Sequence, residues 1–148
     1  MKRILPLFII LFLLGCSKDS VTYRMTAFIN GDAWQCIMPV IVVENMKLVI
    51  TGTSLDGRTI IITVNGISPG RYQLSAAEGL AQCAALYKAS LQVSDEDAYA
   101  SIDGSITLSS VDQVNNRVSG TFQFSCYRNL TESVSITQGQ ITNAKITF

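Results

Sequence analysis

Carboxylates are the main candidates for chemistry in this chain, because its 148 residues include no histidine. Without an imidazole, Ser-His-Asp and Cys-His activation of a nucleophile and a His-ligated zinc site are excluded. Cleavage of a glycoside would need two acids about 5 to 10 Å apart across a cleft. Glu44, Glu78 and Glu132 are the candidates for such a pair, but their sequence contexts predict neither burial nor a raised pKa. We therefore expect no enzyme, and a carboxylate-dependent hydrolase is the alternative.

A second set of carboxylates could supply oxygen ligands to a calcium ion. It comprises Asp95-Glu96-Asp97, with Asp103 and Asp112 elsewhere in the chain. The segment lacks the alternating Asp or Asn ligands, the central glycine and the terminal glutamate of an EF-hand loop. We therefore interpret it as a solvated acidic turn and predict neither a bound metal nor another cofactor.

One cysteine, Cys16, lies at a position that is typical of lipid attachment. The chain has two basic residues near its start, an apolar run over residues 4–14, and then Gly15 and Cys16. The run has roughly half of the ~20 residues that a membrane-spanning helix needs, so export followed by cleavage before Cys16 is the better interpretation. The Leu-Leu-Gly-Cys sequence at residues 13–16 resembles the lipobox of bacterial lipoproteins. This resemblance implies that the thiol of Cys16 receives a diacylglyceryl group and that its freed amine, after cleavage, receives an acyl chain.

These features divide the chain into three parts. Residues 1–15 are expected to be a lipoprotein signal peptide, residues 16–22 the lipidated cysteine and a polar tether, and residues 23–148 a single β domain. Two or more acyl chains hold a protein stably at a membrane, so the membrane is the first expected partner. Loss of the signal peptide leaves nine basic and eleven acidic side chains. This near balance provides no basic face for nucleic acid.

Three further cysteines, Cys36, Cys83 and Cys126, follow in a chain that we expect to enter an oxidising compartment. They allow at most one intramolecular disulfide, and all three pairings are open. Cys36 alternates with Trp34, and Cys126 alternates with Phe124, so both thiols are predicted to point inward. The chain lacks a Cys-x-x-Cys pair, which argues against a zinc site.

Aromatic side chains could form a platform for a sugar or a peptide. Trp34, Tyr72 and Tyr87 are the candidate ligand-platform residues. The alternative is that they pack in the core or at its rim, as most aromatic side chains of a small β domain do. Trp34 follows a predicted hairpin turn in alternation with Cys36, and we expect it to anchor the core.

Short β-branched and aromatic runs, separated by turn dipeptides, predict antiparallel hairpins along the domain. Asn30-Gly31 is the strongest hairpin signal, and Asp56-Gly57 is a second one. Ile60-Ile61-Ile62 is apolar at successive positions, which predicts a central strand covered on both faces. The expected strands cover residues 23–29, 33–38, 40–44, 47–55, 58–65, 72–74, 86–93, 98–102, 105–110, 118–127 and 134–136, with a continuation towards Ile146.

This spacing predicts an all-β fold. We expect a single antiparallel β-sandwich or β-barrel of about nine to eleven strands, between which the sequence does not decide. Residues 76–86 are rich in alanine and predict either the one short helix or an irregular crossing loop.

Several motifs occur in a recognisable order. Phe28-Ile29-Asn30-Gly31-Asp32-Ala33-Trp34 opens the domain, and Pro69-Gly70-Arg71-Tyr72-Gln73-Leu74, Gly120-Thr121-Phe122-Gln123-Phe124 and Ile136-Thr137-Gln138-Gly139 follow. The pattern resembles a group of small lipoproteins of the Bacteroidetes that are described only as domains of unknown function. The resemblance covers roughly residues 26 to 142, and it implies a place in the bacterial outer membrane, facing either the periplasm or the cell surface. It implies no catalytic residues.

The expected function is that of a lipid-anchored protein of the cell envelope, acting as a non-enzymatic binding or structural module. Candidate partners beyond the membrane are another envelope protein, a glycan, or a small apolar ligand if a barrel encloses a cavity. A further alternative is an inhibitor or immunity-type lipoprotein that inserts a loop into a lytic enzyme. Residues 75–85 are the first candidate for such a loop.

Overall fold

The computed structural model describes residues 23–74 and 81–147, so the predicted signal peptide, Cys16 and the tether lie outside the described residues. The described residues form ten β-strands and no helix, which confirms the predicted all-β class and strand number. The strands are β1 (Arg24–Ile29), β2 (Asp32–Cys36), β3 (Val40–Glu44), β4 (Lys47–Thr53), β5 (Thr59–Val64), β6 (Gly70–Leu74), β7 (Cys83–Lys88), β8 (Tyr99–Asp112), β9 (Arg117–Arg128) and β10 (Glu132–Thr147).

Residues with positive φ angles build the tight turns between neighbouring strands. Asn30 (φ 50°) and Gly31 (φ 86°) have the left-handed conformations that a type I′ turn requires, so the predicted β1–β2 hairpin forms. The turn between β3 and β4 also has two left-handed residues, Asn45 (φ 48°) and Met46 (φ 65°). Its sequence does not signal such a turn, because methionine rarely adopts this conformation.

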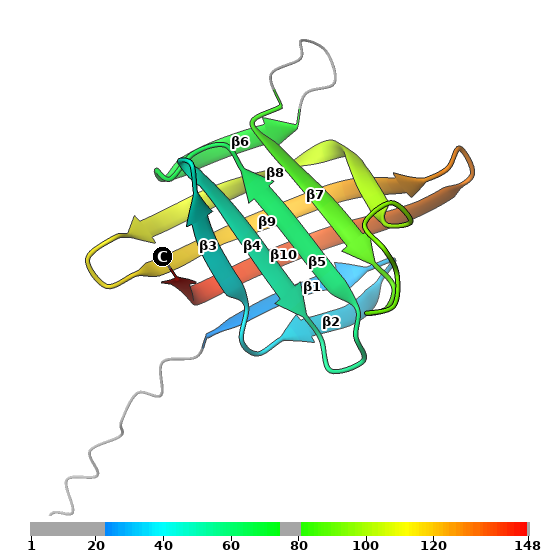
Figure 1. The fold of residues 1–148 in the computed structure, drawn as a ribbon, viewed down its shortest axis with the longest axis horizontal. Coiled ribbons are helices and arrows are strands. Elements are labelled where there is room, and N and C mark those ends of the chain that lie inside the picture. The colour runs from blue at the N-terminus through cyan, green and yellow to red at the C-terminus, as the bar shows by residue number, and fades with distance from the viewer. Residues whose placement is uncertain (1–22, 75–80, 148) are drawn as a thin grey trace, which may run out of the picture.

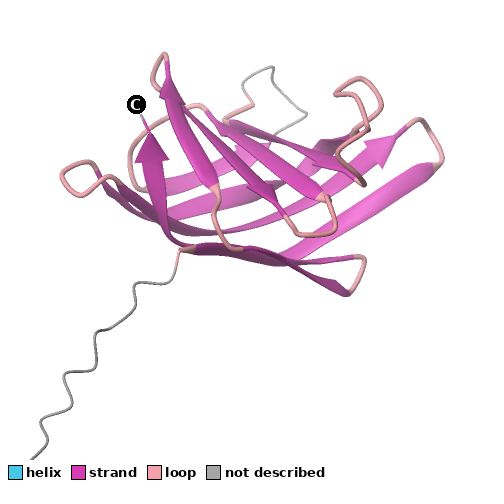
Figure 2. Ribbon diagram, turned by 60° about the horizontal axis from the view of Figure 1, so that its bottom comes forward, coloured by secondary structure: helices cyan, strands magenta, loops and turns pink. Residues whose placement is uncertain are grey.

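Seven strands close a ring of hydrogen-bonded pairs in the order β9-β10-β3-β4-β5-β7-β8. Strands β3, β4, β5 and β7 form one layer that crosses over the long strands β8, β9 and β10 (Figures 1 and 2). Two short contacts join the layers: β10 pairs with β3 in parallel at Ile146 and Thr147, and β7 pairs with β8 at Leu86 and Tyr87. The β1–β2 hairpin extends the ring from β10, and β6 extends it from β8. The domain is therefore a flattened barrel.

Side chains from both layers fill the space between them. Along β9, every second residue from Val118 to Cys126 is buried, which is the alternation expected of a strand with one face on a core. The rings of Phe122 and Phe124 lie with their centroids 6.4 Å apart. Ile50 and Ile62 contribute to the same core from the crossing layer, and both are fully buried. The inside of the barrel therefore serves packing.

The long strands continue through positions that the sequence suggested as breaks. The sequence predicts separate strands at residues 98–102 and 105–110, but β8 runs without a break from Tyr99 to Asp112, and the segment 134–136 is part of the 16-residue β10. The register shifts within these strands, between Ser101 and Asp103 and between Ile136 and Gly139. Such bulges bend a strand without ending it. A residue with a left-handed backbone conformation, Gln138 (φ 50°), therefore lies inside β10.

Three further predictions were wrong in detail. The strand expected at residues 86–93 is β7 at Cys83–Lys88, and residues 89–97 form a loop closed by hydrogen bonds such as Ala98 N to Asp95 O (3.4 Å). The predicted helix or crossing loop at 76–86 therefore ends in a strand, in which Ala85 faces the core, while residues 75–80 lie outside the described residues. The β5 strand is central as expected, but Ile61 on its outer face is only half-buried.

Candidate functional site

An open groove of about 620 Å³ lies at one end of the barrel. One wall is the end of β2 and the loop after it, and the other wall is the end of β4 and the turn after it. Three apolar side chains at this groove point into solvent: Ile37 is 58% exposed, Met38 79% and Leu55 98%. We call this site the apolar groove, and it is lined by Gln35, Cys36, Ile37, Met38, Thr53, Ser54, Leu55 and Asp56.

Trp34, which precedes the lining residues Gln35 and Cys36 on β2, ties the two walls of the apolar groove together. The Trp34 side chain is 2% exposed, and its Nε1 donates a hydrogen bond of 3.1 Å to the carbonyl oxygen of Arg58. The same ring covers Gly52, where an added Cβ would lie 2.7 Å from the Trp34 ring. Only glycine therefore fits at this position of β4, where the close contact packs β4 against β2 next to the groove.

The β4–β5 turn that carries Leu55 is closed by a network around Arg58. The Arg58 Nε lies 2.8 Å from an oxygen of Asp56, and its Nη2 donates to the carbonyl oxygen of Ala33 at 3.3 Å. The Ser54 hydroxyl donates to Asp56 and to the Arg58 carbonyl oxygen. These contacts fix the conformation of the turn, so Leu55 is presented to solvent by an ordered backbone.

The single carboxylate of the apolar groove is not suited to donate a proton. The hydrogen bond from Ser54 is the largest influence that lowers the pKa of Asp56, and the contacts with Arg58 lower it further. A general acid needs the opposite shift, towards neutral pH. The groove therefore offers an apolar contact surface, and its polar groups are engaged with one another.

The three candidate platform residues are not brought together. Trp34 lies on β2 and Tyr72 on β6, the two end strands of the sheet order, while Tyr87 lies on β7. Tyr87 is 5% exposed and packs against Tyr99, with ring centroids 5.8 Å apart. Tyr72 is half-buried, and its hydroxyl donates to the Ser68 carbonyl oxygen at 2.8 Å. All three side chains pack within the domain, as the alternative interpretation expected.

The three cysteines of the domain are free and buried. They lie on β2, β7 and β9, and each points inward, which matches the prediction for Cys36 and Cys126. The disulfide considered among them is not formed in the structure. Burial raises the pKa of the Cys126 thiol to about 12 and also raises the pKa of Cys83, whose Sγ lies 3.3 Å from the carbonyl oxygen of Tyr72. High pKa values make both thiols poor nucleophiles.

The candidate acids are dispersed. Glu44 is exposed at the end of β3, and Glu132 is paired with Arg128 Nε at 2.6 Å, which lowers the pKa of Glu132. The acidic segment 95–97 is exposed, and Asp95 is paired with Lys88. Glu78 lies outside the described residues. Within residues 23–74 and 81–147, no three His, Cys, Asp or Glu side chains are grouped closely enough to hold a metal ion.

A second hollow, of about 480 Å³, lies on the outer face of β6, β8, β9 and β10. It differs from the apolar groove because amide and hydroxyl side chains dominate its lining. We call it the polar hollow, and its polar side chains are those of Arg71, Ser105, Thr107, Thr121, Gln123, Gln138 and Gln140.

Neither the apolar groove nor the polar hollow was identified from the sequence. Two signals could have pointed to the groove. Ile37 and Met38 are apolar residues in a loop, just before Pro39, and Leu55 is an apolar residue in a turn where polar residues are usual. The candidate loop at 75–85 is only partly described: Ala81 and Gln82 are exposed, and Cys83–Ala85 belong to β7.

None of the described residues forms a helix that is long and apolar enough to span a bilayer. A family model for a domain of unknown function, DUF6252, matches residues 22–145 of the chain. Comparisons with curated proteins and with solved structures gave no match. The match covers far more than half of the chain and includes every described strand except the last residues of β10.

Proposed function

The chain belongs to the DUF6252 family, and from that premise we propose that it is a lipid-anchored protein of the bacterial cell envelope that acts as a non-enzymatic binding module. The proposal includes a signal peptide at residues 1–15, lipidation at Cys16, and a place in the outer membrane of a member of the Bacteroidetes. Support for the anchor comes from the basic start, the short apolar run and the Leu-Leu-Gly-Cys sequence that ends at Cys16.

The apolar groove is the observation that carries the binding role. Side chains fill the inside of the barrel, so a ligand has to be met on the surface. At the groove, Ile37, Met38 and Leu55 are held in solvent by an ordered loop and turn, where they gain nothing for the stability of the domain. Apolar groups that are exposed together in this way are typical of contact surfaces.

The alternative of a carboxylate-dependent hydrolase receives less support. Such an enzyme needs one carboxyl with a raised pKa, so that it can donate a proton near neutral pH. Hydrogen bonds lower the pKa values of Asp56, Asp112 and Glu132 instead. Each of these three groups already has a local partner, namely Ser54, Asn115 and Arg128.

A glycan is the second candidate ligand, and the polar hollow favours it. Gln123, Gln138 and Gln140 offer both donors and acceptors there, which suits the hydroxyl groups of a sugar. The hollow lies on the long strands and shares no lining residue with the apolar groove, so the two sites are separate.

Metabolic labelling tests the anchor. Cells that express the chain are grown with an alkyne-tagged palmitate, and the purified protein is coupled to a fluorophore after delipidating washes. We expect label on the parent chain and none on Cys16→Ser. The mass of the mature parent protein should correspond to a lipidated chain that begins at residue 16. Label that persists in Cys16→Ser, or an unmodified mature chain, would overturn the proposal.

A photoreactive residue tests the binding site. It replaces Leu55 in the apolar groove, and in a matched control it replaces Leu130, which is fully exposed in the β9–β10 turn. Irradiation of whole cells should give a defined adduct from position 55 and none from position 130. Equal adduct patterns from both positions would contradict a binding role for the groove.

A further inference from the structure

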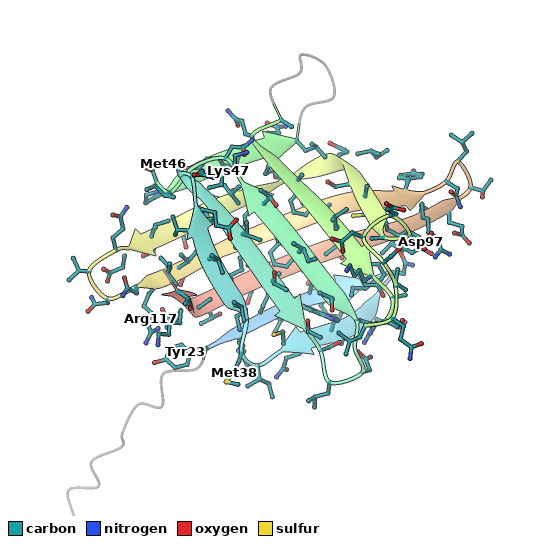
Figure 3. All side chains as sticks on the ribbon, viewed as in Figure 1. Tyr23, Met38, Met46, Lys47, Asp97 and Arg117 are labelled. Carbon is teal, nitrogen blue, oxygen red and sulfur yellow. The ribbon has the colours of Figure 1, made fainter. Side chains whose placement is uncertain are left out.

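The apolar groove lies at the end of the domain where the chain enters β1. In the β1–β2 hairpin, Met25 is opposite Cys36, so the residues before Met25 lie beside those after Cys36. Tyr23 and Met38 are accordingly found at the same end of the molecule (Figure 3). Whatever precedes Tyr23 therefore starts beside the groove.

The sequence limits how far this end can be from the anchor. Six residues, 17–22, separate Cys16 from Tyr23. An extended chain covers about 3.3–3.6 Å per residue, so the seven steps from Cys16 to Tyr23 span about 25 Å at most. A domain of this size has a radius of gyration of about 14 Å. This reach is less than twice that radius, so the barrel cannot stand with the groove end pointing directly away from the membrane.

The chemistry of this end suits a phospholipid surface. Arg117 donates a hydrogen bond of 2.9 Å to the Tyr23 hydroxyl, and its guanidinium lies 4.4 Å from the centre of that ring. Arg24 and Lys145 are exposed on the neighbouring strands β1 and β10. Of the acidic side chains at this end, Asp56 is paired with Arg58, and Asp112 keeps its charge while it accepts a hydrogen bond from Asn115, so Arg24, Arg117 and Lys145 outnumber the one uncompensated carboxylate.

Basic, aromatic and apolar side chains together are the usual composition of a surface that enters the headgroup region of an anionic bilayer. We propose that the groove end of the barrel, with Ile37, Met38 and Leu55 at its rim, lies against the phospholipid surface of the membrane that holds the anchor. This inference rests on the proposed function and names the partner of the same site.

A second copy of the chain fits this surface less well. A stable protein–protein interface buries about 1,200 Å² or more, which three rim side chains cannot supply. Contact with a membrane needs far less, because the acyl chains already hold the domain at the bilayer and make the contact effectively intramolecular. Weak insertion of Met38 and Leu55 is then enough to orient the barrel.

Tryptophan fluorescence of the lipidated protein tests the orientation. The protein is reconstituted into vesicles of phosphatidylethanolamine and phosphatidylglycerol, with and without brominated phosphatidylcholine, which quenches tryptophans close to the acyl chains. New tryptophans are placed by Leu55→Trp and Met38→Trp, and the matched control is Leu130→Trp. Trp34 is the one native tryptophan, so its constant signal is subtracted with the parent protein.

We expect a blue shift on reconstitution and several-fold stronger quenching for Leu55→Trp and Met38→Trp than for Leu130→Trp. Adding Met38→Asp to the Leu55→Trp protein should remove most of that quenching, since a carboxylate resists transfer out of water. Both positions are exposed in the monomer, so these variants should keep the parent fold.

Each other outcome overturns the inference, and flotation of the vesicles separates the reasons. If the protein floats with the vesicles but positions 38 and 55 are quenched no more than position 130, the domain is anchored without docking. If the protein does not float, the anchor fails and docking fails with it. If Cys16→Ser protein shows the same blue shift without vesicles, increasing with protein concentration, the groove binds a second copy instead.

Discussion

The inside of the barrel and the apolar groove are both lined by apolar side chains, but they differ in what those side chains contact. Ile50, Ile62 and Phe122 are at most 3% exposed and belong to one buried cluster formed by both crossing layers. Leu55, at the groove, is 98% exposed, although an ordered turn holds it in place. The interior thus stabilises the domain, whereas the groove rim contributes surface that only another molecule can cover.

Trp34 lies on the boundary between these regions, and its replacement gives the largest expected effect. Trp34→Ala removes a buried ring and its hydrogen bond to Arg58, so it should lower the free energy of unfolding by about 3–5 kcal/mol. Leu55→Ala, at the rim of the same groove, should change it by less than about 0.5 kcal/mol. Urea unfolding followed by circular dichroism measures both. Similar losses for the two variants would show that the rim is part of the core.

The hairpins and the buried alternation could be read from the sequence, because both are local. Asn30-Gly31 sets its own turn, and Val118 to Cys126 keeps a period of two without help from distant residues. The strand pairing that closes the ring between β10 and β3 could not be predicted from the sequence. The parallel contact of Ile146 with Ile41 links residues from the two ends of the domain, and no local pattern indicates which strands will meet there.

The continuous strands β8 and β10 show a related limit. Gly104 and Gly139 have turn character in the sequence, yet each lies within a strand because the paired strand β9 continues alongside. The apolar groove escaped prediction for the same reason. Its two walls, at residues 35–38 and 53–56, become neighbours only after β2 and β4 pack together around Trp34 and Gly52.

Alkaline pH should destabilise the domain through a buried thiol of the interior and should leave the groove unaffected. Burial raises the pKa of Cys126 from 9.0 to about 12, so above pH 9 the unfolded state releases this proton more readily than the folded state. Stability should therefore fall as pH rises, by about 1.4 kcal/mol at roughly pH 10 from this thiol alone. Urea unfolding near pH 8 and pH 10 in a reducing buffer measures the loss. Cys126→Ala should reduce the dependence, and an unchanged dependence would mean that the thiol is solvated.

Acidic pH tests the groove through Asp56, and here we expect the smallest change in stability. The pKa of Asp56 is lowered from 3.8, first by the hydrogen bond from Ser54 and then by Arg58, so its ionised form favours the folded turn. That stabilisation is complete above the unfolded pKa and disappears as pH falls through the lower folded pKa. The parent should therefore lose slightly more thermal stability than Asp56→Asn between about pH 5 and pH 2, and the two should differ little in high salt, because exposed charges are screened. Melting curves at these pH values measure the difference. A large, salt-resistant loss in the parent would place Asp56 inside the packed barrel rather than at the solvent-exposed turn that presents Leu55.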